Sequence, residues 1–239
     1  MCHRIKRTIE NLDAIASDMS RFHILERSHD TRPSAIVERE QTHSFVHTSD
    51  VIRRDQDKKN IVDLLLNSNL NLGGGDNREQ EQVSIISIVG IGGLGKTTLA
   101  QLAYNDHSVV EHFKLRMWVC VSDDFDVKKL TKEIMKCIRA NIDCSNQEME
   151  QLQADLRKEL DGKRYLLVLD DVWNEDLDKW VKLRGLLTGG SVGSKILVTT
   201  WSEKVASIMG TSNIRAYHLG GLSEDECWSL FKQWAFEQG

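Results

Sequence analysis

A glycine-rich segment followed by a lysine and two threonines has the residue types and spacing of an anion-binding loop. The segment matches G-x-x-x-x-G-K-[ST], the phosphate-binding loop of P-loop NTPases. Only glycine permits both the positive φ angles of such a loop and the close approach of phosphate oxygens. The candidate cofactor-binding residues are Gly90, Ile91, Gly92, Gly93, Leu94, Gly95, Lys96, Thr97 and Thr98.

The context of this loop decides between two interpretations. One interpretation is a glycine-rich turn with an exposed lysine, which would bind no ligand, and the other is a nucleotide site. Here an apolar strand pattern at 83–89 precedes the loop, and a helical pattern at 98–103 follows it. A helix that begins near Lys96 directs its N–H groups and its dipole at the same anion. We therefore expect a nucleotide site, with Lys96 on the β- and γ-phosphates and the Thr97 hydroxyl on Mg²⁺.

A second candidate group follows the apolar run 166–169, which ends in Asp170 and Asp171. A strand that delivers an aspartate at its carboxyl end places a carboxylate beside a phosphate-bound metal. We expect Asp170 to bind Mg²⁺, directly or through water, and Asp171 to position or deprotonate an attacking water. The alternative is a pair of exposed aspartates that cap a turn.

The segment 195–200 places hydroxyl groups in a similar position. Thr200 is a candidate contact for a γ-phosphate. An equally simple alternative is that Thr200 or Ser202 caps the helix that follows.

The remaining chain alternates strand and helix patterns. Helical spacing resumes at Asp55, and His107 and His112 are expected to flank a loop and to be solvated. Strands are predicted at 83–89, 115–121, 165–169, 195–199 and 214–219, and helices at 126–141, 147–160, 177–187, from 202 and from 223. This alternation predicts an α/β fold, a doubly wound five-stranded parallel sheet that binds its ligand at the carboxyl ends of the strands.

The N-terminal part has a different pattern. Residues 3–26 read as one amphipathic helix whose apolar positions alternate spacings of four and three, as in a coiled coil. A single helix lying on a partner surface explains the pattern equally well. Residues 28–50 are polar and aperiodic, contain the only proline and are interpreted as a linker.

Composition excludes several classes. The 239 residues are 40% hydrophobic and 28% charged, as in soluble proteins, and the net charge of −5 argues against a general nucleic-acid binder. No apolar run is long enough to span a membrane, and the N-terminus lacks the apolar region of a secretion signal. The five cysteines have no metal-binding spacing, and their odd number and scatter suit a reducing cytoplasm.

Ordered blocks of sequence resemble the NB-ARC module of plant disease-resistance NBS-LRR proteins of the coiled-coil (non-TIR) type. Beside the phosphate-binding loop, 113–125 resembles the block that marks the non-TIR branch, 166–173 the kinase-2 strand and 193–200 the sensor strand. Residues 217–219 and 222–231 are similar to the block that opens the helical ARC subdomain. The resemblance implies four parts: the end of a coiled-coil domain at 1–27, a linker at 28–50, a nucleotide-binding domain at 51–220 and the start of a helical subdomain at 221–239.

The resemblance also implies a function. Members of this family are switches in plant defence, with ADP bound at rest and ATP bound in an oligomeric, triggered form. Hydrolysis then serves as a reset, so at most a slow ATPase is expected and no metabolic enzyme. Val51 and Ile52 match the motif that lies near the adenine, and the N-terminal helix matches a region that binds protein partners.

Three departures from the family pattern keep alternatives open. Arg53 stands where the family has glycine, and Trp201 stands where its sensor strand ends in arginine. The chain also stops before the later ARC motifs and the leucine-rich repeats, as expected of a fragment or a truncated product. A nucleotide-impaired interaction fragment or adaptor is therefore the main alternative. A P-loop phosphotransferase would need an acceptor site and an arginine-bearing lid, for which the sequence offers no candidate.

Overall fold

The structure is a computed structural model that describes residues 42–46, 51, 54–67, 83–121, 125–139, 147–210 and 216–236. All of them belong to one compact unit, residues 41–239. The predicted helix at 3–26, most of the predicted linker, Ile52 and Arg53 lie outside the described residues.

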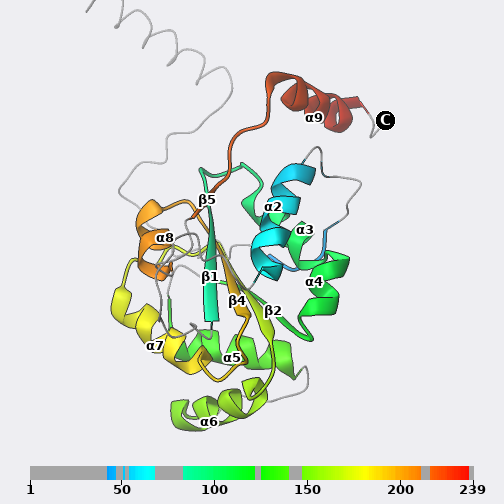
Figure 1. The fold of residues 1–239 in the computed structure, drawn as a ribbon. Helices are drawn as coiled ribbons and strands as arrows, with labels where there is room; N and C mark the ends of the chain where they lie inside the picture. The colour runs from blue at the N-terminus through cyan, green and yellow to red at the C-terminus, as the bar shows by residue number, and fades with distance from the viewer. Residues whose placement is uncertain are drawn as a thin grey trace, which may run out of the picture. The chain divides into compact units, whose positions relative to one another are not determined.

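A five-stranded parallel sheet forms the centre of this unit, with the strand order β2-β3-β4-β1-β5 (Figure 1). The strands are β1 (Val83–Val89), β2 (Leu115–Cys120), β3 (Tyr165–Asp170), β4 (Ser194–Thr200) and β5 (Tyr217–His218). The chain crosses from β1 to the far edge at β2, returns through β3 and β4, and then passes beyond β1 to β5. This order confirms the predicted fold class, and it brings the carboxyl ends of β1, β3 and β4 to one edge.

Helices cover both faces of the sheet (Figure 1). One face packs against α2 (Asp55–Leu66), α3 (Lys96–Tyr104) and α4 (His107–His112). The other packs against α5 (Val127–Ile138), α6 (Met149–Leu160), α7 (Leu177–Leu187) and α8 (Glu203–Met209). Along β3, Leu167 and Leu169 join one core while Leu166 and Val168 join the other. Because side chains alternate along a strand, a strand covered on both faces must be apolar at every position.

Local sequence signals set several helix boundaries. The Asp126 carboxylate caps α5 by accepting a hydrogen bond from the Lys129 N–H at 2.8 Å. The Ser202 hydroxyl caps α8 by accepting from Val205 N–H at 3.3 Å. Helix α6 ends at Leu160, and Gly162 follows with a φ of 65°, the left-handed conformation that glycine adopts most easily.

Helix α4 corrects one prediction. His107 and His112 do not flank a loop; they are the first and last residues of α4. The Asp106 carboxylate accepts from Ser108 N–H at 3.0 Å and caps this helix, while Val109 is buried against the sheet. One buried apolar residue in a single short helix gives too little periodicity for recognition from sequence.

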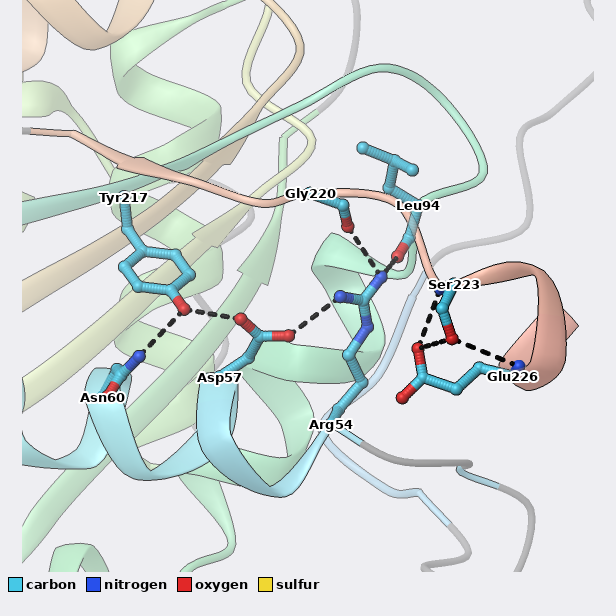
Figure 2. Close-up of polar contacts among 8 residues, drawn as sticks. All are labelled: Arg54, Asp57, Asn60, Leu94, Tyr217, Gly220, Ser223 and Glu226. Atoms are coloured by element: carbon cyan, nitrogen blue, oxygen red, sulfur yellow. Dashed lines mark hydrogen bonds and ion pairs between the residues drawn. The ribbon is translucent and has the colours of Figure 1, made fainter.

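The last helix, α9 (Glu224–Phe236), follows β5 after a short connection. Ser223 and Glu226 form a capping box: the Ser223 N–H donates to Glu226 Oε2 at 2.8 Å, and the Glu226 N–H donates to Ser223 Oγ at 3.4 Å (Figure 2). The domain boundary predicted near residue 220 falls in this connection and stays a prediction. Within the part of the chain that the structure covers, no helix has the length and apolarity to cross a membrane.

Candidate nucleotide-binding site

The phosphate-binding loop (Gly90–Thr98) connects the carboxyl end of β1 to the first turn of α3. Gly93 and Gly95 have φ angles of 80° and 87°, and Gly95 is the N-cap of α3. A residue with a Cβ is strained in this left-handed region, so the sequence pattern and the backbone geometry agree. The N–H groups of the first turn of α3 are therefore directed at the space that the loop encloses.

Lys96 is the cation of this loop. Its Nζ donates to the carbonyl oxygen of Ile91 at 3.0 Å, which folds the side chain back over the loop. Partial burial lowers the pKa of Lys96, while the charges of Asp171 and Asp170 act in the opposite direction. The lysine therefore lies within electrostatic reach of the two aspartates that the sequence also singled out.

Asp170 is completely buried at the end of β3 and accepts hydrogen bonds from several hydroxyl groups. The Thr97 Oγ1 lies 3.0 Å from Asp170 Oδ1 and 3.1 Å from Oδ2, and Thr199 Oγ1 donates to Oδ1 at 2.5 Å. Thr42 Oγ1 donates to Oδ2 at 2.7 Å. A buried carboxylate beside a hydroxyl of the phosphate-binding loop is a donor set of the kind that Mg²⁺ takes together with phosphate oxygens and waters. The residues present fit that ion.

The backbone of Asp171 has an unusual conformation. Its φ is 57°, and its N–H donates to Thr199 Oγ1 at 2.8 Å. Thr199 therefore accepts from Asp171 while it donates to Asp170, and it fixes the two aspartates relative to each other. A left-handed non-glycine residue costs about 1 kcal/mol or more and is commonest at functional sites.

Thr200 lies beside the phosphate-binding loop but its hydroxyl is directed to the next turn. Thr200 pairs in register with Val89, and its carbonyl oxygen accepts from Gly90 N–H at 3.3 Å. Its side chain is buried, and Oγ1 accepts from Ser202 N–H at 3.1 Å. The side chain thus takes part in the turn into α8, and a contact with a γ-phosphate stays a prediction.

Trp201 follows Thr200 and is 54% exposed. Its ring centroid lies 5.2 Å from that of Trp173, at an interplanar angle of 48°. The residue that replaces the expected arginine therefore packs against a second indole at the same edge of the sheet as the aspartates.

Arg54, which sequence reasoning did not single out, connects three segments (Figure 2). Its guanidinium donates to Asp57 at 2.8 Å, to the carbonyl oxygen of Leu94 at 2.9 Å and to that of Gly220 at 3.1 Å. Tyr217 donates from its hydroxyl to Asp57 at 2.5 Å. The start of α2, the phosphate-binding loop and the connection to α9 are thus joined through one side chain. Of the two residues expected near the adenine, Val51 is half-buried and Ile52 lies outside the described residues.

Comparisons with known proteins identify the family. The model of the NB-ARC domain matches residues 75–239, which is more than half of the chain. The chain belongs to the NB-ARC family. This confirms the resemblance seen in the sequence and assigns the phosphate-binding loop to a nucleotide-binding module.

The similar proteins are plant disease-resistance proteins. The NB-ARC chain is 47% identical to the putative disease resistance protein RGA4 of Solanum bulbocastanum over 98% of its own length and 22% of the relative's. It is 43% identical to the disease resistance protein RGA2 of the same species, over 98% of its own length and 23% of the relative's. The chain thus spans less than a quarter of the length of these relatives.

Solved structures support the fold. The ORC2 protein of Aeropyrum pernix in its ADP form superimposes with a TM-score of 0.57 at 17% identity, over 81% of this chain and 55% of that one. Cdc6p of Pyrobaculum aerophilum gives a TM-score of 0.57 at 16% identity, over 80% of this chain and 51% of that one. At these identities the likeness shows the P-loop NTPase fold alone.

Proposed function

We propose that this chain is the ADP/ATP-binding switch module of a plant immune receptor that acts in defence against pathogens. One observation carries the proposal: the phosphate-binding loop, whose Lys96 folds back over it, holds the Thr97 hydroxyl against the buried carboxylate of Asp170. The similarity to disease-resistance proteins supports the biological setting.

Each side chain has an assigned role. The N–H groups of the loop and Lys96 would hold the phosphates of the nucleotide. Thr97 and Asp170 would hold Mg²⁺, which when bound neutralises phosphate charge. Asp171 would orient an attacking water and accept its proton. The slow hydrolysis of ATP that results would reset the switch. Val51 and Ile52 are proposed for the adenine end, and Thr200 for the γ-phosphate.

The wider setting is part of the proposal, and the similarity to disease-resistance proteins supports it. We propose that the receptor acts in the cytoplasm, where its N-terminal segment, predicted to be helical, binds protein partners and a full-length form oligomerises. A γ-phosphate adds charge and contacts that favour a second arrangement of domains, which is how nucleotide exchange can act as a switch.

Titration of the purified chain with fluorescent ADP tests this function, with and without Mg²⁺ and with unlabelled ADP and GDP as competitors. Two results together support the switch: saturable ADP binding that is stronger in Mg²⁺, and weak competition by GDP for the same site. Absence of binding up to millimolar ADP contradicts it.

The second candidate is a nucleotide-impaired interaction fragment, and the observation that favours it is Trp201 in place of the expected arginine. The same titration separates the two functions, because the impaired fragment would not bind ADP. Turnover of ATP in the presence of common acceptors would instead indicate a phosphotransferase.

A further inference from the structure

Residues 42–46, upstream of the nucleotide-binding core, lie along helix α3. Gln101 of α3 and Asn105, the C-cap of that helix, hold the backbone of this segment: Gln101 Nε2 donates to His43 O at 2.5 Å, and Asn105 Nδ2 donates to Ser44 O at 2.6 Å. Both acceptors are main-chain carbonyls, so the attachment fixes the path of the segment, whichever side chains it carries.

The spacing on α3 explains where this segment leads. Thr97, Gln101 and the C-cap Asn105 are each four residues apart, so they form one row along the helix and its C-terminal end. His43 and Ser44 contact the second and third residues of that row. One residue earlier, Thr42 reaches the level of Thr97 and of its partner, Asp170.

The protons at Asp170 show what Thr42 contributes. Thr97 has a single hydroxyl proton, and its oxygen lies at nearly equal distances from Oδ1 and Oδ2. Oδ1 has a second donor, Thr199. The second donor to Oδ2 is Thr42, at 2.7 Å. Because Asp170 is completely buried, its charged oxygens need such donors.

A carboxylate oxygen has two lone pairs. When the single proton of Thr97 goes to Oδ1, which also accepts from Thr199, the Thr42 hydrogen bond leaves one lone pair of Oδ2 for another ligand. It also restricts rotation of the carboxylate about its Cβ–Cγ bond. Removal of a group that orients a metal-binding carboxylate in this way typically lowers metal affinity by about 10–100-fold.

We propose that Thr42 is a positioning residue of the metal site, which the 42–46 segment supplies from outside the nucleotide-binding core. Attachment of this segment to α3 and metal-dependent binding of nucleotide are then linked, so each strengthens the other. The inference rests on the proposed function of the site.

The test measures ADP affinity in excess Mg²⁺ and in EDTA for Thr42→Val and Thr42→Ser, and compares the ratio of the two affinities. Thr42→Val removes the hydroxyl at nearly constant volume and should reduce the ratio about tenfold, with the EDTA affinity unchanged. Thr42→Ser keeps the hydroxyl and should stay within about twofold of the native ratio. Thr188→Val is the matched control, because it removes an exposed hydroxyl that contacts Gly185 O on α7.

Loosening the segment from α3 should act in the same direction. Asn105→Ala removes one attachment and should reduce the Mg²⁺-dependent ratio by a smaller factor, about threefold. Native and variant chains are compared in one buffer, and circular dichroism establishes that each is folded.

Several outcomes overturn the inference. In Thr42→Val, an unchanged ratio, equal losses with and without Mg²⁺, or a raised ratio each contradict the positioning role. A raised ratio would mean that the hydroxyl competes with the metal. If the native chain binds no ADP, the proposed function itself fails, and this result is distinct from a native chain that binds while Thr42→Val matches it.

Discussion

Replacement of Arg54 tests whether the contacts drawn in Figure 2 hold the phosphate-binding loop to the rest of the fold. The Arg54 guanidinium makes an ion pair with Asp57 and donates to the carbonyls of Leu94 and Gly220. The side chains of Arg54 and Asp57 are 10% and 26% exposed, so the ion pair is only partly screened by water. Arg54→Ala therefore removes three contacts of one partly buried cation.

The expected loss follows from these exposures. A partly screened ion pair contributes up to about 1 kcal/mol. A hydrogen bond from a charged donor contributes about 1.5–3 kcal/mol when buried, and less here because water can replace the donor at Gly220. We expect Arg54→Ala to lower the free energy of unfolding by about 2 kcal/mol, roughly a thirtyfold change in the folding equilibrium.

Arg54→Lys separates charge from geometry. Lysine keeps the positive charge but has one nitrogen, so it cannot contact Asp57 and both carbonyls with the planar fork of arginine. We expect it to recover less than half of the loss.

The assay is urea unfolding followed by circular dichroism, with Lys59→Ala as the matched control, since Lys59 is an exposed cation on the same helix. A change in the midpoint at constant slope would identify a change in stability. If Arg54→Ala and Lys59→Ala unfold within about 0.5 kcal/mol of each other, a value typical of exposed sites, the reasoning is refuted.

Three further predictions concern the nucleotide site and the packing of the protein core. Asp171→Asn should retain ADP binding and slow ATP hydrolysis at least about a hundredfold; loss of ADP binding would contradict its role. Trp201→Arg should raise ATP affinity about tenfold or more by adding one charged hydrogen bond and leave ADP affinity unchanged; equal shifts in paired titrations would exclude a γ-phosphate sensor. Gly190→Ala should lower stability by about 1–3 kcal/mol, because the new Cβ would lie 2.5 Å from a ring carbon of buried Tyr165. Thermal melts of both variants measure this. Gly185→Ala is the control, because its new Cβ would meet no atom within 4 Å and should not lower the stability of the protein.

The parts of the fold that depend on local pattern could be predicted from the sequence. An apolar strand, a glycine loop and a helix are consecutive in the chain, so 83–104 was predictable as one unit. Asp170 was predictable too, because parallel strands of such a sheet end at one edge. The Ser223–Glu226 capping box joins residues three positions apart, and the sequence placed the start of α9 within one residue.

The parts that sequence could not predict are single polar contacts between distant segments. Thr42 reaches Asp170 across 128 positions, and Arg54 reaches Gly220 across 166. Neither contact leaves a periodic signal, because each involves one side chain in an irregular segment. The sequence showed that Thr199 lies near the end of a predicted strand. Its two contacts, one with each aspartate, depend on the register of β3 against β4.

The most direct test of the nucleotide site is ADP titration of Lys96→Ala against the native chain, with Lys163→Ala as the control. Lys163 is an exposed lysine that pairs with Glu159. Loss of the Lys96 cation removes a charged hydrogen bond to the phosphates, so affinity should fall about tenfold or more, while Lys163→Ala should bind as the native chain does. Equal ADP affinity in the native chain and Lys96→Ala would contradict the assignment of the site.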